Sequence, residues 1–239
     1  MKFKHVLLIF SCALTFFNCK EEQKLIFSDI NITTKSNSIV EVNIPEIIGN
    51  ETISNKINSE IQKIVITALH IGNPDEITST SIKESIELFN SEYNTFKNDF
   101  PDSFQPWEAQ IDGEVMYQTT NIISIALTSY ANTGGAHGIL NISFLNFDIK
   151  TGQKIENKAL FNDVEAVKKI VKSYLIDNTI EKNIFLEDNE FKLPENIGYS
   201  ENGIIILYNT YEVAPYVSEI IEFAVPYNSI ESYLIYNSF

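Results

Sequence analysis

Two hydrophobic periods alternate along the chain. Apolar and polar residues that alternate by position are typical of half-buried strands, and apolar residues spaced by three or four are typical of amphipathic helices. The predicted strands are residues 24–33, 38–45, 107–117, 122–130, 139–149, 204–209 and 219–225. The predicted helices are residues 53–69, 82–96, 163–175 and 230–235. Strand runs interrupted by a few helices predict an α+β fold, with mostly antiparallel sheet, and not a doubly wound parallel sheet.

Capping, turn and proline residues mark where these predicted elements begin and end. Asn50 or Thr52 is expected to cap the first helix. Residues 150–153 (KTGQ) predict a hairpin turn in which Gly152 supplies a positive φ. The stretch 101–106 (PDSFQP) is the best candidate boundary. We therefore expect two small mixed domains, at residues 38–105 and 106–239, after a signal peptide at 1–18 and a tether at 19–37.

Composition and charge limit the function. The 239 residues are 44% hydrophobic and carry a formal charge of −15, with 17 basic residues, all of them Lys. A chain without Arg and with this charge is a poor candidate for a nucleic-acid partner, because phosphate binding uses a basic face. The composition also excludes a collagen or coiled-coil rod and a polytopic membrane protein.

The N-terminus predicts export and lipidation. Lys2 and Lys4 precede a largely apolar run, Val6–Phe17, which is shorter than the roughly 20 residues that span a bilayer. Cys19 follows this run and resembles the lipidated cysteine of a bacterial lipoprotein, although large residues precede it. The Lys-Glu-Glu that comes next looks like the surface-export signal of Bacteroidetes lipoproteins. We expect a lipid-anchored, surface-exposed outer-membrane protein of charge −17, the alternative being an ordinary signal peptide with an incidental cysteine.

Motifs for catalysis are missing from the sequence. A chain that begins at Cys19 keeps one cysteine, two histidines and no nucleophile elbow, P-loop, dinucleotide fingerprint or metal-protease motif. We therefore expect no catalytic residue, no metal and no cofactor. His137 lies among glycines and is either an exposed base or, the reading we favour, a side chain that bonds neighbouring backbone. His70, at the end of a predicted helix, is interpreted as a C-terminal charge partner.

Two segments resemble a bacterial extracytoplasmic domain family, the one shared by the lysozyme-sensing anti-sigma factor RsiV and the non-catalytic region of the peptidoglycan deacetylase PdaC. The first is residues 130–138 (YANTGGAHG) with 147–152 (FDIKTG), and the second is 206–216 (ILYNTYEVAPY) with 225–227 (VPY). Upstream, residues 42–49 (VNIPEIIG) are similar to the companion N-terminal domain of PdaC. Sigma-factor regulation and deacetylation do not carry over, because the chain lacks the segments for both.

Two functions stay open. In the first, the chain is a non-enzymatic module that captures lysozyme or another cationic protein, through loops that carry the motifs. In the second, it is a peptidoglycan-binding accessory protein or a cryptic hydrolase or deacetylase, with Trp107, Tyr211, Tyr216 and Tyr227 as a sugar-binding surface or as packing. The candidate binding residues are Asn132, Thr133, Gly134, Gly135, His137, Tyr211, Glu212 and Tyr216.

Overall fold

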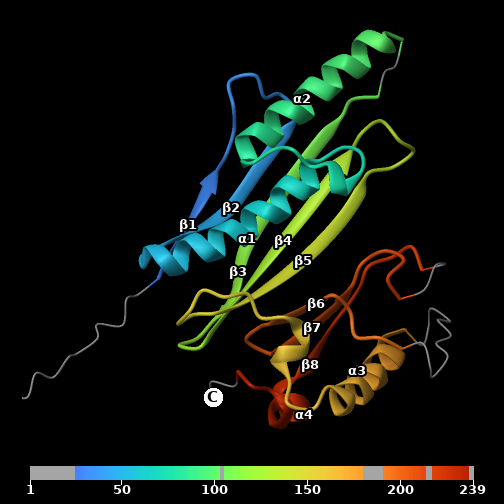
Figure 1. Cartoon of the computed structure of the whole chain (residues 1–239). Coiled ribbons are helices and arrows are strands. Elements are labelled where there is room, and N and C mark those ends of the chain that lie inside the picture. Colours follow the sequence, from blue (N-terminus) through green and yellow to red (C-terminus); the bar gives the residue numbers. More distant parts are fainter. Residues whose placement is uncertain (1–24, 103–104, 180–190, 214–216, 237–239) are drawn as a thin grey trace, which may run out of the picture.

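The fold comprises two sheets with helices on their faces (Figure 1). The computed structural model describes residues 25–102, 105–179, 191–213 and 217–236. A five-stranded sheet has the order β1-β2-β3-β4-β5, and a three-stranded sheet has the order β6-β7-β8. All strand pairs of the two sheets are antiparallel except β2 and β3, which run parallel. The predicted α+β fold with mostly antiparallel sheet is therefore confirmed.

The elements of the first sheet are close to those predicted. The strands are β1 (Ile26–Asn31), β2 (Val40–Ile48), β3 (Glu108–Gln118), β4 (Ile122–Asn132) and β5 (Ile139–Asp148). The helices are α1 (Glu51–Leu69) and α2 (Ile82–Asp99), with a short 3-10 turn, η1 (Pro74–Glu76), between them. Asn50 caps α1 by accepting the Ile53 N–H, which confirms one of the two predicted caps.

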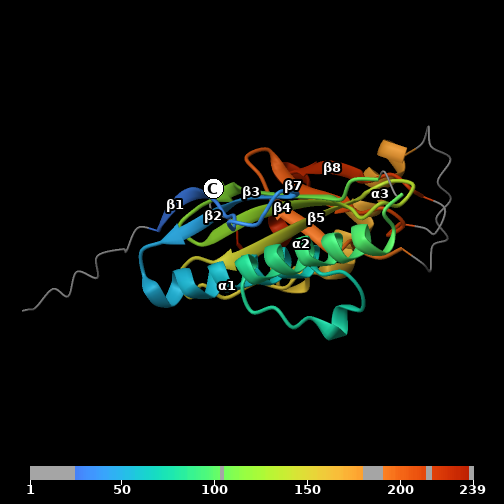
Figure 2. The ribbon, with the colours of Figure 1, turned by 90° about the horizontal axis from the view of Figure 1, so that it is seen from above.

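Strand β4 of the first sheet is buried on both faces. Ile123, Ile125 and Leu127 join the core that α1 and α2 cover, whereas Ile122 and Ala126, which alternate with them, pack with residues of the second sheet. Figure 2 shows the two helices on one side of the sheet and β7 and β8 on the other. We call the side away from the helices the outer face.

The predicted boundary at residues 101–106 does not separate two cores. Strands β3 to β5 lie after it and complete the same sheet as β1 and β2, and one buried cluster extends from Leu25 to Phe147. Proline and polar residues mark the loop between α2 and β3, but they carry no information about which strands will pair. The first sheet ends with β5, so the second structural unit begins after residue 148 and not at residue 106.

The second sheet carries the remaining helices. Its strands are β6 (Asn196–Tyr199), β7 (Gly203–Tyr208) and β8 (Ile221–Pro226). The other elements are η2 (Asn157–Leu160), α3 (Val164–Thr179), α4 (Tyr227–Ile230) and η4 (Glu231–Tyr233). The closing helix predicted at 230–235 therefore begins three residues earlier, directly after Pro226. Among the described residues, no helix is both long and apolar enough to cross a bilayer.

The predicted turn after β5 is confirmed. Gly152 has a φ of +67°, and its N–H donates to the Asp148 carbonyl over 2.8 Å. A Cβ at this position would lie 2.7 Å from the Ile53 carbonyl oxygen. The turn therefore needs glycine for its backbone angle and for its close approach to the start of α1.

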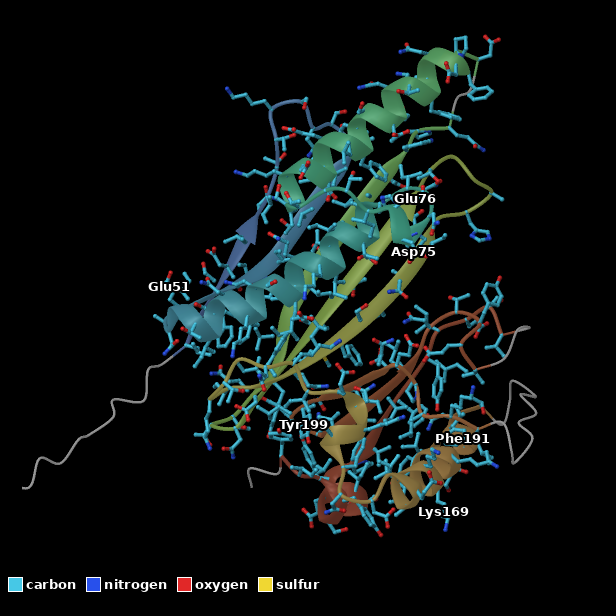
Figure 3. The ribbon with its side chains drawn as sticks, viewed as in Figure 1. Glu51, Asp75, Glu76, Lys169, Phe191 and Tyr199 are labelled. Atoms are coloured by element: carbon cyan, nitrogen blue, oxygen red, sulfur yellow. The ribbon has the colours of Figure 1, made fainter. Side chains whose placement is uncertain are left out.

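Buried polar groups join the two sheets. The Asn146 amide of β5 donates to the Ile197 carbonyl over 2.7 Å, and its oxygen accepts the Ser124 hydroxyl. That hydroxyl in turn accepts the Tyr199 N–H over 2.9 Å. Tyr199, labelled in Figure 3, thus lies where β6 meets the first sheet. Because these groups are buried, their hydrogen bonds fix how the second sheet sits on the first.

Candidate functional site

The first motif forms the β4–β5 loop at one end of the large sheet. The Asn132 side chain accepts the Gly134 N–H over 3.0 Å, and Gly134 has a φ of +84°. Gly138 lies against the Tyr130 ring, where a Cβ would approach ring atoms to 2.3 Å. Gly135 has neither a positive φ nor a close contact. The need for glycine is therefore at 134 and 138, and not at 135.

The two described histidines bond to nearby backbone. His137 is exposed, and its Nδ1 lies 3.1 Å from the Gly138 carbonyl oxygen. His70 follows the last residue of α1, and its Nε2 lies 2.9 Å from the Asn73 carbonyl oxygen. Both contacts hold a loop in shape. Among the described residues, no group of three or more His, Cys, Asp or Glu side chains is arranged to hold a metal ion.

The second motif begins within β7, and the carboxylate of its own Glu212 holds the turn that follows this strand. Glu212 accepts the Asn209 N–H over 2.8 Å and the Glu195 N–H over 2.7 Å. Tyr211 has a φ of +65° and is 56% exposed, and its N–H donates to the Val217 carbonyl over 2.7 Å. A bulky residue in the left-handed region is strained and persists only where its surroundings fix it. Tyr211 thus presents an exposed ring, and its own backbone N–H is held by Val217.

Strand β5 links the two motifs. The Asn209 side chain donates to the Ile142 carbonyl over 2.8 Å and accepts the Ile142 N–H over 3.0 Å. It thereby takes the place of a neighbouring strand at the sheet edge. Since Ile142 follows Gly138 by four residues, the second motif is attached to the strand that begins at the first. Two other predicted residues, Cys19 and Tyr216, lie outside the described residues.

Of the predicted aromatic surface, the described Trp107 and Tyr227 are packing residues. Trp107 is only 7% exposed and packs among the rings of Phe89, Tyr93 and Phe96 on α2, with ring-centroid distances of 5.2–5.9 Å. The Tyr227 hydroxyl donates to the Ser200 carbonyl over 2.6 Å, and this side chain is only partly exposed. Trp107 therefore belongs to the core under the β4–β5 loop, because the strand alternation turns it toward α2.

An open groove of about 1000 Å³ lies beside the first motif. We call it the outer groove. Its lining includes Asn31, Glu41, Asn43, Trp107, Gln110 and Tyr130. Cross-strand register brings Glu41, Gln110 and Tyr130 into one row on adjacent strands of the sheet. The same register places Asn31, Asn43 and Asp112 in the next row.

Hydrogen bonds connect the side chains of these rows into what we call the polar ladder: Asn31, Asn43, Asp112 and Gln110. Asn31 donates to Asn43 over 2.8 Å, and Asn43 donates to Asp112 over 3.1 Å. Gln110 donates to the other Asp112 oxygen over 2.7 Å. Alternation along β2 and β3 indicates that these residues point outward, but the parallel pairing that aligns them joins segments almost 70 residues apart. Sequence reasoning therefore missed this site.

A second groove, of about 520 Å³, lies on the opposite side of the β4–β5 loop. We call it the helix groove. Its lining includes Thr67, His70, Ile71, Thr133, Ile139 and Asn141. Of the predicted binding residues, Thr133 lines this groove, whereas Asn132 and Gly134 hold the loop between the two grooves.

The segment that forms the first sheet and its helices is strongly acidic. Residues 25–149 contain 16 acidic residues and five Lys. Glu41, Glu108 and Glu114 are exposed on β2 and β3, at outward positions of the strands. Within the described part of this segment, one ion pair forms between side chains, Lys63 with Glu60 over 2.5 Å. Most of its carboxylates therefore face solvent without a lysine partner.

Two family models match successive segments of the chain, in the order that the sequence predicts. Residues 32–140 match the family "Deacetylase PdaC", and residues 154–228 match "Protein of unknown function (DUF3298)". The first match continues through β3 and β4, as the first sheet does. No curated protein matches the chain.

Solved structures share the fold. A DUF3298 family member from Bacteroides fragilis is 18% identical, with a TM-score of 0.64, over 90% of this chain and 95% of the other. A DUF3298 family protein from Pseudomonas aeruginosa is 16% identical, with a TM-score of 0.57, over 89% and 94%. The architecture of both sheets is thus that of DUF3298 proteins.

Proposed function

Since the chain joins a PdaC-type domain to a DUF3298-type domain, we propose that it is a non-enzymatic extracytoplasmic module that binds a cationic protein of the lysozyme type. The resemblance of both motifs to a lysozyme-sensing domain motivates the choice of partner. The observation that carries the proposal is the acidic surface of the first sheet.

The acidic surface suits a cationic partner. Glu41, Glu108 and Glu114 lie on the adjacent strands β2 and β3, and Glu108 is paired with Asn132 at the start of the β4–β5 loop. Fields of opposite sign raise association rates by one to three orders of magnitude at low salt, and salt screens them within about 10 Å at 0.1 M. In this proposal, the partner is therefore attracted mainly by the carboxylates of the first sheet.

Tyr211 supplies an anchor of a different kind. Its ring is exposed, and hydrogen bonds of Tyr211 and Glu212 fix the loop that bears it. Tyrosine is enriched among the residues that dominate interface energies, because a rigid ring buries a large area at little entropic cost. In this proposal, Tyr211 slows dissociation while the carboxylates speed association.

We expect surface plasmon resonance to detect binding of c-type, g-type or i-type lysozyme. A triple variant, Glu41→Gln with Glu108→Gln and Glu114→Gln, should lower the on-rate roughly tenfold at low salt. The matched control, Glu87→Gln with Glu92→Gln and Asp99→Asn, changes the net charge equally on α2 and should have a much smaller effect. Equal effects of the two triples would contradict the assigned surface.

Two further measurements distinguish the alternative function from capture of a cationic protein. Retention on purified peptidoglycan, without binding to any lysozyme at high micromolar concentration, would favour a peptidoglycan-binding accessory protein. Release of sugar or acetate from that peptidoglycan would favour a cryptic hydrolase or deacetylase.

Localisation is part of the proposal. We propose that Cys19 is acylated and that the protein is anchored to the outer membrane, facing outward. Fatty-acid labelling in the native host is expected to mark the wild type and not the Cys19→Ala variant. A wild type that is fully soluble after secretion would overturn this assignment.

A further inference from the structure

Hydrogen bonds fix the side chains of the polar ladder before any ligand binds. Its four side chains lie on three adjacent strands and are ordered by mutual hydrogen bonds of 2.7–3.1 Å. Planar groups that are already fixed lose little rotational freedom when a ligand binds. Three of them, Asn31, Asn43 and Gln110, line the outer groove, whose volume of about 1000 Å³ is at the upper end of the range for ligand sites.

The ladder keeps unused donors and acceptors. Each amide NH₂ carries two hydrogens, and each oxygen of the Asp112 carboxylate accepts more than one bond. Asn43 therefore has a further donor, and Gln110 has a further donor and a free carbonyl oxygen, next to the Asp112 acceptors. A cation can use only the acceptors, and an anion only the donors. Neighbouring hydroxyl groups use both, because each donates and accepts.

An aromatic ring stands beside the ladder. Tyr130 is paired with Gln110 across β3 and β4 and lines the same groove. Gly138 of the first motif packs against this ring without room for a Cβ. The motif thus holds the ring in place. The negative face of an aromatic ring attracts the C–H face of a sugar, and sugar sites combine such a ring with a few fixed polar groups.

We propose that the outer groove is a glycan-binding site, in which the polar ladder holds adjacent hydroxyl groups of a pyranose and Tyr130 stacks on the ring. The ligand class follows from the mixed donors and acceptors and does not depend on the acidic charge of the domain. Glu41 and Glu108 of the surface proposed to attract a cationic protein also line this groove, and the tests below distinguish the two ligands.

Calorimetry with the folded chain from residue 20 onward tests the proposal. The probes are β-1,4-linked N-acetylglucosamine oligomers and cello-oligosaccharides, with purified peptidoglycan and an α-glucan as pull-down arms that separate cell-wall sources from others. We expect binding of at least one probe, with a Kd that is the same at 0.05 and 0.5 M salt, because the ligand is neutral.

Paired variants locate the site. Tyr130→Ala should weaken binding about tenfold, whereas Tyr130→Phe, which keeps the ring face, should stay within about twofold. Asn43→Ala with Gln110→Ala should weaken it by a similar or larger factor. The control Asn141→Ala removes an exposed amide from the helix groove and should leave the Kd unchanged. Thermal unfolding verifies that each variant folds.

Three results would overturn the proposal. One is no binding of any glycan at millimolar concentration. Another is binding that neither the Tyr130→Ala nor the double amide variant weakens. The third is a groove that binds polylysine, with loss on Glu41→Gln and Glu108→Gln, while it binds no glycan. The third result would assign the groove to the cationic partner. Failure of the glycan proposal is therefore distinguishable from failure of lysozyme binding.

Discussion

Replacement of Asn146 by leucine is expected to lower the free energy of unfolding by about 3 kcal/mol. The side chain is 1% exposed; it bonds the Ile197 carbonyl of the second sheet and the Ser124 hydroxyl on the neighbouring strand of the first sheet. Leucine has a similar size, but it leaves the Ile197 carbonyl and the donor hydrogen of the Ser124 hydroxyl buried without a partner, which costs about 1–3 kcal/mol for each group. Urea unfolding followed by circular dichroism measures the change.

A control on the same strand isolates burial as the cause. Asn141 is five residues earlier on β5 and exposed, so Asn141→Leu should change the unfolding free energy by no more than about 0.5 kcal/mol. If Asn146→Leu were equally mild, the polar contact between the sheets would not contribute to stability as we infer. Loss of cooperativity in the Asn146 variant, with two transitions, would show that this contact couples the two units.

Local structure could be predicted from the sequence because its causes are local. The three-and-four spacing from Ile57 to Leu69 gives α1 its buried face, and alternation gives β3 its two faces. Gly152 was predicted to have a positive φ because a hairpin turn demands one. In each case the determining neighbours lie within a few residues.

Pairing across long separations could not be predicted. The parallel contact of β2 with β3 joins Asn43 to Asp112, and nothing near either residue specifies it. The boundary at 101–106 was wrong for the same reason, since a Pro-rich loop leaves open whether the next strand returns to the earlier sheet. Trp107 shows a related limit, because strand alternation does not say which face α2 will cover.

The motifs were easier to find than to interpret. Composition indicated that Asn132, Gly134 and Gly138 lie in a tight loop, and the structure places them there. Only the fold shows that Gly138 packs against Tyr130 and so connects the motif to the outer groove. Asn43 lies in the segment 42–49 that resembles the PdaC-type domain, whereas Gln110 and Asp112 lie outside the motif segments.

High pH is expected to unfold the protein through its buried tyrosines. Tyr199 is 1% exposed, and burial, with smaller effects of Tyr117 and Tyr236, raises the pKa of its hydroxyl above the ordinary value of about 10. Tyr208 is 3% exposed, and burial together with the Glu212 charge raises its pKa in the same direction. Both groups keep their protons in the folded state and lose them near pH 10 when the chain unfolds.

The sign and size of the effect follow from proton linkage. Above about pH 10 the folded state binds more protons than the unfolded state, so stability is constant below that pH and falls as the pH rises. Each group contributes about 1.4 kcal/mol per pH unit, and the two together about 3 kcal/mol. A stability of about 5–15 kcal/mol would be largely consumed two to three units above pH 10.

Absorbance at 295 nm and circular dichroism, recorded together from pH 8 to 13, test this expectation. A cooperative step with loss of the circular dichroism signal should accompany ionisation of the buried Tyr199 and Tyr208 hydroxyls. Tyr199→Phe keeps the ring that stacks on Tyr117 at 5.9 Å and removes one ionisable hydroxyl. This variant should lose stability with pH less steeply than the wild type. Ionisation of every tyrosine in a single step near pH 10, with the fold intact, would show that Tyr199 and Tyr208 are accessible to solvent and not part of the core.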